Sequence, residues 1–441
     1  MRVVVVGQGY VGLPLAVRAA EVGHEVIGYD VDAGRIKRLA AGESYVEDVA
    51  AERLGAVLAS GAYRASDAAR DCGGFDVAVV TVPTPLREGV PDLSYIEESA
   101  RTLSRYLRPG ATVVLESTTY PGTTQDLFGP LLEDGSGLTA GRDFHLGYSP
   151  ERIDPGNAVW GFQQTPKVVS GVDAASLKAV GSFYGQLVDT VVPVSSPKEA
   201  ELAKLLENTF RHVNIALVNE IAMFARHLDI DVWQAIDAAA TKPFGFMRFT
   251  PGPGVGGHCL PIDPSYLSWR VQRELGQSFR FVELANDINN HMPEYVTRRL
   301  IEAFNERRRS VNGSRILLLG LAYKKNTGDA RESPALRVAQ LLLDLGAEVH
   351  AADPHVVEPP EVDARLARVE LTAEELAAAD AVVLLTDHDS FDYELVRAHA
   401  SYVLDCRRRL IAQDTTGTQA SGGQGPGGQA DAAPGATVEV L

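Results

Sequence analysis

The chain has 441 residues and a formal net charge of −17, from 41 basic and 58 acidic residues. This length exceeds what one hydrophobic core supports, so we expect two or three domains. The acidic balance argues against nucleic acid as a partner, because phosphate binding needs a basic face. No stretch has the roughly 18 uncharged apolar residues of a membrane helix, so no membrane association is expected.

Three cysteines, Cys72, Cys259 and Cys406, lie far apart in the sequence. Their odd number and the lack of CxxC or His/Cys spacing argue against a zinc site. The valine-rich start runs directly into Gly7, which is unlike a signal peptide. We therefore expect a cytoplasmic protein with reduced thiols.

Residues 1–195 alternate short apolar runs with helical patterns. The predicted helices include 10–22 and 93–107, and the predicted strands are 3–6, 25–29, 77–82, 112–116, 167–170 and 190–194. Such alternation predicts a parallel sheet with helices on both faces, an α/β Rossmann domain.

The first predicted strand runs into Gly7-Gln-Gly9-Tyr10-Val11-Gly12, the G-x-G-x-x-G spacing of a dinucleotide-binding turn. The first glycine permits the tight turn, the second lets backbone approach a pyrophosphate, and the third lets helix and strand pack closely. Asp30 ends the next strand, where an acid binds ribose hydroxyls, so NAD is favoured over NADP. Arg35 nearby leaves that preference open, and a Rossmann-like fold without cofactor is the alternative. Asp32 is interpreted as a turn or helix-cap residue.

At Ser196 the pattern becomes helical, with Pro197 in the first helical position. Apolar residues then recur at helical spacing for about 30 residues, whereas the mean helix has about 11–12. We interpret 196–308 as a central helical domain whose long helix links two domains and packs against a second subunit in a homodimer. Further helices are predicted over 231–240, 263–275 and 280–305.

Residues 315–322 run from a strand into a glycine turn for a second time. A helix over 334–345 and strands over 348–351 and 381–385 predict a second, Rossmann-like α/β domain over 309–410. This domain lacks a full G-x-G-x-x-G, so no second dinucleotide is assigned to it. Residues 411–441 are rich in Gly, Gln, Ala and Pro, and we expect them to be disordered.

The stretch Pro251-Gly-Pro-Gly-Val-Gly-Gly-His-Cys259-Leu-Pro-Ile-Asp263 places a cysteine on a glycine-rich loop. Cys259 is either a buried small hydrophobe or a nucleophile. The glycines let the backbone bend around a ligand. Asp263, interpreted as a helix N-cap, puts the thiol near a helix N-terminus, which lowers a thiol pKa. The two readings are equally supported by these residues; Cys72 and Cys406 lack this setting and are interpreted as structural.

Three other groups are candidates for chemistry. Lys204 and Asn208 are four apart and share a helix face, with Leu205 and Leu206 expected to be buried on the opposite side. Thr118 and Glu151 each follow a predicted strand, where ligands bind in open α/β sheets. The alternative for Lys204 and Asn208 is a solvated stripe on the helix. The alternative for Thr118 is a plain turn, and the alternative for Glu151 is an ordinary surface acid.

Together these stretches resemble the UDP-glucose/GDP-mannose dehydrogenase family, from about residue 1 to 410. The motifs that carry the resemblance are Gly7-x-Gly9-x-x-Gly12, Val82-Pro-Thr-Pro, Ser117-Thr118, Ser149-Pro-Glu151, Glu201-Leu-Ala-Lys204-Leu-Leu-Glu-Asn208, Gly256-Gly-His-Cys259-Leu-Pro-Ile-Asp263, Gly320-Leu-Ala-Tyr-Lys324-Lys, Arg331-Glu-Ser-Pro and Asp405-Cys-Arg407-Arg. The resemblance implies an NAD-dependent, metal-free oxidation of the C6 alcohol of a nucleotide sugar to a carboxylate.

The resemblance also implies roles for individual residues. Thr118 and Asp263 would hold a water at the alcohol, and Cys259 would form a thiohemiacetal and then a thioester. Glu151 would assist hydrolysis, while Lys204 and Asn208 would stabilise the oxyanion. The remaining residues implied in binding are Tyr10, Val11, Thr84 and Thr118 at the cofactor and Glu151, Lys204, Gly256, Lys324, Arg331 and Arg407 at the substrate.

Two departures bear on the substrate. Pro150-Glu151-Arg-Ile-Asp154-Pro155 lacks the second glutamate common in UDP-glucose enzymes, and Ser117-Thr-Thr-Tyr-Pro121 has its proline one place later. Both, with Pro251-Gly-Pro-Gly, resemble the branch that acts on UDP-N-acetylhexosamines. UDP-N-acetylglucosamine or UDP-N-acetylmannosamine is therefore the expected substrate. The alternatives are a UDP-glucose 6-dehydrogenase, a two-electron β-hydroxyacid dehydrogenase and a non-enzymatic NAD-sensing scaffold.

Overall fold

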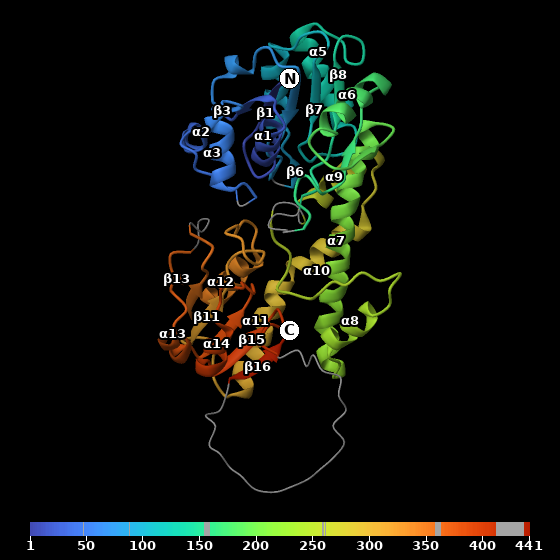
Figure 1. Ribbon diagram of the computed structural model, residues 1–441. Coiled ribbons are helices and arrows are strands. Elements are labelled where there is room, and N and C mark those ends of the chain that lie inside the picture. Colours follow the sequence, from blue (N-terminus) through green and yellow to red (C-terminus); the bar gives the residue numbers. More distant parts are fainter. Residues whose placement is uncertain are drawn as a thin grey trace. The chain divides into compact units, whose positions relative to one another are not determined.

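The computed structural model describes residues 1–46, 48–87, 89–153, 159–257, 260, 262–357, 363–411 and 436–441 (Figure 1). They form two compact units. The first unit comprises Met1–Thr209 and Ile262–Phe279, and the second comprises Phe210–Pro261 and Arg280–Leu441. Each unit contains a six-stranded parallel sheet, so the expected α/β class is confirmed.

The first sheet has the strand order β3-β2-β1-β4-β7-β8. Its strands are β1 (Arg2–Val6), β2 (Glu25–Tyr29), β3 (Tyr63–Ser66), β4 (Val77–Val80), β7 (Thr112–Leu115) and β8 (His145–Tyr148). The strand order reverses between β1 and β4. The turns that follow these two strands therefore lie at the switch point where open α/β sheets bind ligands.

Helices cover both faces of this sheet because successive side chains of a strand point to opposite faces. Val3 and Val5 pack with α1, α3 and α6, whereas Val4 and Val6 pack with α4 and α5. These helices are α1 (Gly12–Glu21), α2 (Ala33–Ala40), α3 (Ala51–Ala59), α4 (Ser94–Ser104), α5 (Gly129–Ser136) and α6 (Ala174–Tyr184).

Two small sheets accompany the first one. β9 (Lys167–Val169) and β10 (Val191–Pro193) form their own parallel pair, rather than extending the main sheet. β5 (Leu86–Arg87) and β6 (Val90–Pro91) form a short hairpin.

The second sheet repeats the topology of the first, with the order β13-β12-β11-β14-β15-β16. Its strands are β11 (Arg315–Leu319), β12 (Glu348–Ala352), β13 (Ala367–Arg368), β14 (Ala381–Leu384), β15 (Tyr402–Asp405) and β16 (Thr437–Val440). The helices of this domain are α12 (Pro334–Asp344), α13 (Ala373–Ala378) and α14 (Tyr393–His399). The predicted Rossmann-like C-terminal fold is thus confirmed.

The central region is helical, as expected. It contains α7 (Pro197–Ala225), α8 (Val232–Ala240), α9 (Asp263–Leu275), α10 (Arg280–Asn290) and α11 (Met292–Glu306). The single helix predicted over 280–305 is wrong: it breaks at His291. Pro293 lacks an amide hydrogen and its ring clashes with the carbonyl four residues earlier, so the chain starts a new helix there.

The expectation that all of 411–441 is disordered is wrong for the last six residues. β16 pairs in parallel with β15 at the edge of the second sheet, from Tyr402↔Thr437 to Asp405↔Val440. Residues 412–435 lie outside the described part of the chain.

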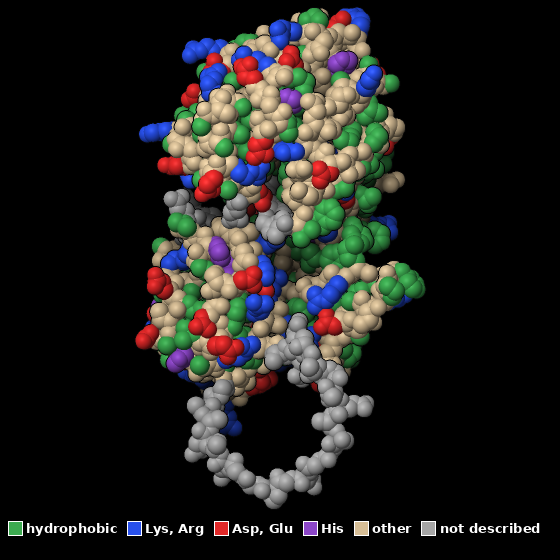
Figure 2. Space-filling view, viewed as in Figure 1, with side chains coloured by type: hydrophobic (Ala, Val, Ile, Leu, Met, Phe, Trp, Pro, Cys, Tyr) green, Lys and Arg blue, Asp and Glu red, His purple; other side chains and the backbone are tan. Residues whose placement is uncertain are grey.

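Helix α7 contributes to both units, and several of its apolar side chains are exposed. Leu206 is 63% and Leu217 is 51% exposed, and Leu202 and Phe210 are exposed too, so the expected burial of Leu206 is wrong. Figure 2 shows hydrophobic side chains at the surface at the level of this helix. Among the described residues, no helix is both long and apolar enough to cross a membrane.

Candidate active site

The turn after β1 has the geometry that a dinucleotide requires. Gly7 has φ +90°, and a Cβ added at Gly12 would lie 1.8 Å from the Gly7 carbonyl oxygen. A Cβ at Gly9, by contrast, would meet no atom within 4 Å. The first and third glycines are therefore fixed by packing, while the second leaves open space for a ligand. Since α1 begins at Gly12 after Val11, its N-terminus supplies the partial positive charge that suits a pyrophosphate.

Asp30 lies buried at the end of β2 and ties the turn to the strand. Its Oδ2 accepts hydrogen bonds from the Gln8 amide at 2.8 Å and the Arg35 guanidinium at 3.0 Å. Asp32 caps α2 by accepting a hydrogen bond from the Arg35 amide at 3.0 Å, as predicted. Because Arg35 already pairs with Asp30, its charge is compensated, which favours NAD over a cofactor with a 2′-phosphate.

The buried face of α7 in the first unit carries Glu201, Lys204 and Asn208, spaced three and four residues apart. Asn208 Nδ2 donates a hydrogen bond to Asp263 Oδ2 at 2.6 Å. The solvated stripe that the sequence left open for Lys204 and Asn208 is therefore ruled out, since both side chains are buried.

Asp263 lies in the first turn of α9, with Ile262 rather than Asp263 at the N-cap, so that expectation is wrong. Its carboxyl group is turned to Asn208 instead of to its own helix. Burial raises the pKa of Asp263 to about 6, against the opposing effects of the Lys204 ammonium and the Asn208 amide. A carboxyl group with such a pKa can gain or lose its proton at a pH close to 7.

Glu201 fixes the loop that carries Thr118, and the sequence did not single it out. Its carboxylate accepts hydrogen bonds from the Gly122 amide at 2.6 Å, the Thr124 amide at 2.9 Å and the Thr124 hydroxyl at 2.7 Å. Thr118 itself is half-buried. The sequence signal that could have identified Glu201 is its position three residues before Lys204, which places both residues on the same helix face.

Glu151 follows β8 and is buried. Its Oε1 accepts hydrogen bonds from the Arg152 and Ile153 amides at 2.6 and 2.5 Å. Burial disfavours the ionised form, but the Lys167 ammonium, the Glu116 carboxyl and the Lys204 ammonium outweigh it, so the pKa of Glu151 lies below its ordinary value. Because Glu151 is buried, the alternative that it is an ordinary surface acid is ruled out.

Thr84 lies after β4 and is held by α9. Its carbonyl accepts a hydrogen bond from the Tyr266 hydroxyl, which is itself buried. The first unit thus brings the predicted cofactor turn together with the strand-end loops of one sheet, and separately joins α7 to α9 through Asn208 and Asp263.

In the second unit, the glycine-rich loop packs onto the C-terminal domain. The Gly257 amide donates to the Arg331 carbonyl at 3.1 Å, and a Cβ at Gly256 would lie 2.7 Å from the Glu332 carbonyl. A Cβ at Gly252 would lie 2.6 Å from the Arg407 guanidinium. The loop therefore contacts Arg407 through Gly252 and the backbone of Arg331 and Glu332 through Gly256 and Gly257. His258, Cys259 and Pro261 lie outside the described residues.

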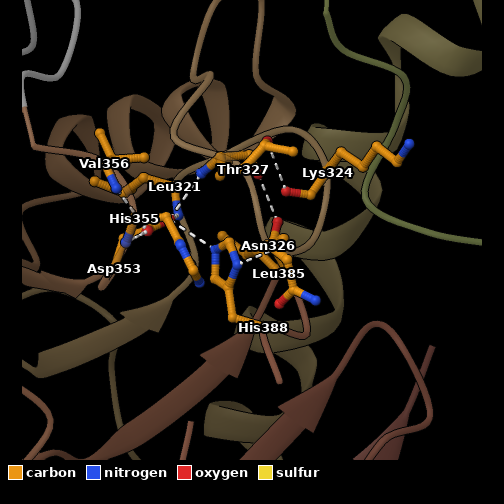
Figure 3. Close-up of polar contacts among 12 residues, drawn as sticks. Leu321, Lys324, Asn326, Thr327, Asp353, His355, Val356, Leu385 and His388 are labelled. Carbon is orange, nitrogen blue, oxygen red and sulfur yellow. Dashed lines mark hydrogen bonds and ion pairs between the residues drawn. The ribbon is translucent and has the colours of Figure 1, made fainter. Parts of the chain in front are cut away.

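The turn after β11 differs from the cofactor turn (Figure 3). Asp353 Oδ2 accepts the Leu321 and Ala322 amides and contacts His388 Nε2 at 3.0 Å. His388 Nδ1 accepts the Asn326 amide at 2.8 Å, so Nε2 carries the proton. The side chain of Lys324 points away from this pair.

Comparison with known proteins identifies the chain's relatives. Models of the UDP-glucose/GDP-mannose dehydrogenase family match residues 1–188 as the NAD binding domain, 198–291 as the central domain and 317–412 as the UDP binding domain. UDP-N-acetyl-D-mannosamine dehydrogenase of Pyrococcus horikoshii is 37% identical over 392 residues, covering 89% of this chain and 90% of that protein. UDP-N-acetyl-D-glucosamine 6-dehydrogenase of Pseudomonas aeruginosa is 38% identical over 359 residues, covering 81% and 83%.

A solved structure gives the same result. The structure of a UDP-D-ManNAc dehydrogenase from Pyrococcus horikoshii has a TM-score of 0.85 and 34% identity, and the match covers 95% of this chain and 97% of that one. Since three consecutive domain models and full-length relatives agree, the chain belongs to the UDP-glucose/GDP-mannose dehydrogenase family and is an NAD-dependent dehydrogenase.

Proposed function

We propose that the chain oxidises the C6 alcohol of a UDP-N-acetylhexosamine to the carboxylate, in two steps that together remove four electrons. The substrate would be UDP-N-acetylglucosamine or its mannosamine epimer. In this proposal residues 1–195 hold NAD, 196–308 carry the cysteine loop, and 309–410 hold the UDP-sugar.

One observation carries the proposal: the buried contact between Asn208 and Asp263, with Lys204 on the same face of α7. Burying an ammonium and a carboxylate is unfavourable unless they are paired or used in chemistry. Here the Asn208 amide and the Asp263 carboxyl group join two helices, α7 and α9, across 55 residues of sequence. An oxyanion formed beside Lys204 and Asn208 would be stabilised without a metal.

In the first oxidation, Thr118 and Asp263 would hold a water that accepts the alcohol proton. NAD⁺ supplies the acceptor for the hydride in each of the two oxidations. With its pKa raised to about 6, Asp263 is largely ionised at neutral pH and can still exchange a proton there. Lys204 would stabilise the alkoxide oxygen as the aldehyde forms.

In the second oxidation, the Cys259 thiolate would attack the aldehyde carbon to give a thiohemiacetal. Loss of a hydride from the same carbon gives a thioester. Water activated by Glu151 then adds to the thioester and the thiolate leaves. Covalent capture would retain the reactive aldehyde between the two oxidations.

The substrate is tested by incubating the purified protein with NAD⁺ and each of three UDP-sugars. We expect two NADH per molecule of one UDP-N-acetylhexosamine and little turnover of UDP-glucose. The choice is supported by the Pro150–Pro155 and Pro251–Gly254 stretches and by the relatives named above. Turnover of UDP-glucose alone would reject it.

The role of Cys259 separates this proposal from a two-electron dehydrogenase. Cys259→Ser should lose most acid production, because a hydroxyl is a poor nucleophile at neutral pH. Cys406→Ser, at a buried cysteine outside the proposed chemistry, is the matched control. Wild-type activity in Cys259→Ala would favour a two-electron β-hydroxyacid dehydrogenase, which needs no thiol. Two NADH per sugar from the wild type would exclude a non-enzymatic sensing scaffold.

We further propose that the chain forms a homodimer through α7. The exposed Leu202, Leu206, Phe210 and Leu217 recur at helical spacing, and an apolar stripe of this kind is typical of an interface. Leu206→Glu with Leu217→Glu should yield a monomer in light scattering at micromolar concentration. A dimer that survives both changes would place the interface elsewhere.

A further inference from the structure

A buried charge cluster lies behind Glu151 in the first unit. It joins Glu116 after β7, Lys167 on β9 and Tyr184 at the end of α6. The Lys167 ammonium forms an ion pair with Glu116, and its Nζ lies 3.5 Å from Glu151 Oε2. The Tyr184 hydroxyl donates a hydrogen bond to the other oxygen of Glu116. Sequence reasoning gave none of these three residues a role.

The charges of this cluster do not balance when both carboxyl groups are ionised. One ammonium between two carboxylates leaves a net charge of −1 in a buried site, so the two carboxyl groups together tend to hold one proton. Burial raises the pKa of Glu116 to about 7, while Lys167 opposes the rise and Glu151 adds to it. Since the pKa of Glu151 is lowered, the proton resides mainly on Glu116 near neutrality.

The two oxygens of Glu151 have different surroundings. Oε1 accepts two backbone amides, from Arg152 and Ile153. Oε2 is buried and accepts no hydrogen bond of ordinary length from the described residues. Oε2 is therefore the oxygen left to take a proton, and Lys167 faces it.

We propose that Lys167 and Glu116 are positioning residues for Glu151: the ammonium keeps Glu151 ionised in a buried site, and Glu116 relieves the excess negative charge by holding a proton. The inference rests on the proposed function, in which Glu151 activates water for thioester hydrolysis. A proton passes from water to Glu151 Oε2, and the water oxygen bonds to the thioester carbon. The carbon–sulfur bond breaks, and its electron pair returns to Cys259 as thiolate.

Other charged groups face the cluster without replacing Lys167. Lys204 on α7 lowers the pKa of both Glu151 and Asp263. Arg152 is paired with Glu207 at 2.6 Å, so its charge is compensated. Burial, then the negative charges of Glu201, Asp263, Glu116 and Glu151, raise the pKa of Tyr148 well above its ordinary value, so Tyr148 stays neutral.

The test follows the hydrolysis of the covalent enzyme–sugar adduct by rapid quenching and intact mass spectrometry across pH 5–9. In the wild type we expect the rate to rise through an inflection near pH 7, because Glu151 becomes more basic as Glu116 loses its proton. Glu116→Gln keeps the side-chain shape and should abolish that inflection. Lys167→Met should shift the rise of the hydrolysis rate at low pH to a higher pH, by about 1–2 pH units, because the ammonium no longer favours the Glu151 carboxylate.

Exposed residues of the same unit provide the controls: Lys178→Met and Glu98→Gln should keep the wild-type profile. A purely structural role for the cluster would lower rates at every pH without changing the profile, and that result would overturn the inference. If Lys167→Met does not fold, the profile of Glu116→Gln decides. A wild type that forms one NADH per sugar and no adduct would instead refute the proposed function itself.

Discussion

The C-terminal strand supports a quantitative prediction about the second unit. Leu441, which follows β16, is 5% exposed, and its carbonyl accepts a hydrogen bond from Trp233 Nε1 at 3.0 Å. Arg299 donates to the Val440 carbonyl at 3.1 Å. These contacts join the end of the chain to the helices α8 and α11.

Leu441→Ala removes most of one buried side chain. A buried Leu→Ala change typically destabilises by about 2–5 kcal/mol, depending on how well the site closes over the space left. Leu441 lines a cavity of about 330 Å³, so its side chain is already incompletely packed. We therefore expect the low end, about 2–3 kcal/mol. For a unit of about 200 residues this lowers Tm by roughly 4–12 °C.

The assay is differential scanning calorimetry, paired with hydrogen exchange of peptides covering β15 and, as an internal reference, β7 of the first unit. Val357→Ala is the matched control because Val357 is 88% exposed, so its Tm should stay within about 2 °C of the wild type. Deleting residues 436–441 should lower protection of β15 as well, since its edge loses a hydrogen-bonded neighbour.

An unchanged Tm in Leu441→Ala, together with unchanged β15 exchange after the deletion, would refute the reasoning. That result would mean that residues 436–441 do not pack stably at the edge of the second sheet.

Three further outcomes follow from the site. Gly257→Ala should destabilise the second unit by about 1–3 kcal/mol in thermal unfolding, because φ is +80° and the new Cβ would lie 2.7 Å from a tyrosine ring. Asp30→Ala should raise KM for NAD⁺ and lower KM for NADP⁺, since Arg35 loses its partner; unchanged ratios would contradict the cofactor assignment. The pKa of Asp263, raised to about 6 by burial, means that the folded protein binds a proton more tightly than the unfolded chain and loses stability as pH rises from about 4 to about 6. Asp263→Asn should match the wild-type free energy of unfolding near pH 4 and exceed it at pH 7 by up to about 3 kcal/mol, while turnover falls; a lower stability than the wild type at pH 7 would contradict the burial argument.

The sequence predicted most interior strands of the two sheets, β7 among them, and missed most of the edge strands. β1, β2, β4, β11, β12 and β14 were found because strands with neighbours on both sides are continuous apolar runs. The edge strands β3, β13 and β16 were missed, and so was the interior strand β15, whereas a strand before Ser149, where β8 lies, was expected. An edge strand such as β3, Tyr-Arg-Ala-Ser, needs a partner on one side alone and carries little hydrophobic pattern.

The candidate site was predictable in kind but not in its contacts. Lys204 and Asn208 were found as a pair because helical spacing links them, and the family resemblance added Asp263. Their contact spans 55 residues of sequence, and no local pattern encodes it. Lys167 and Glu116 were missed for the same reason, since each is a single charge at the end of an apolar run and its partner is 51 residues away.

The two sheets share one topology, but the aspartates that follow their second strands have different surroundings. Both place an aspartate after the second strand, where it accepts a backbone amide from the turn after the first. Asp30 is also paired with Arg35, whose side chain is partly exposed, and the middle glycine of its turn faces open space. Asp353 is enclosed: its oxygens accept the Leu321, Ala322, His355 and Val356 amides, and His388 occupies its remaining side. Burial alone raises a carboxyl pKa, but these donors hold the pKa of Asp353 well below its ordinary value. A carboxylate with every lone pair in use has none to offer a ribose, so the second sheet keeps the strand order of a dinucleotide fold while its aspartate serves to fix a loop.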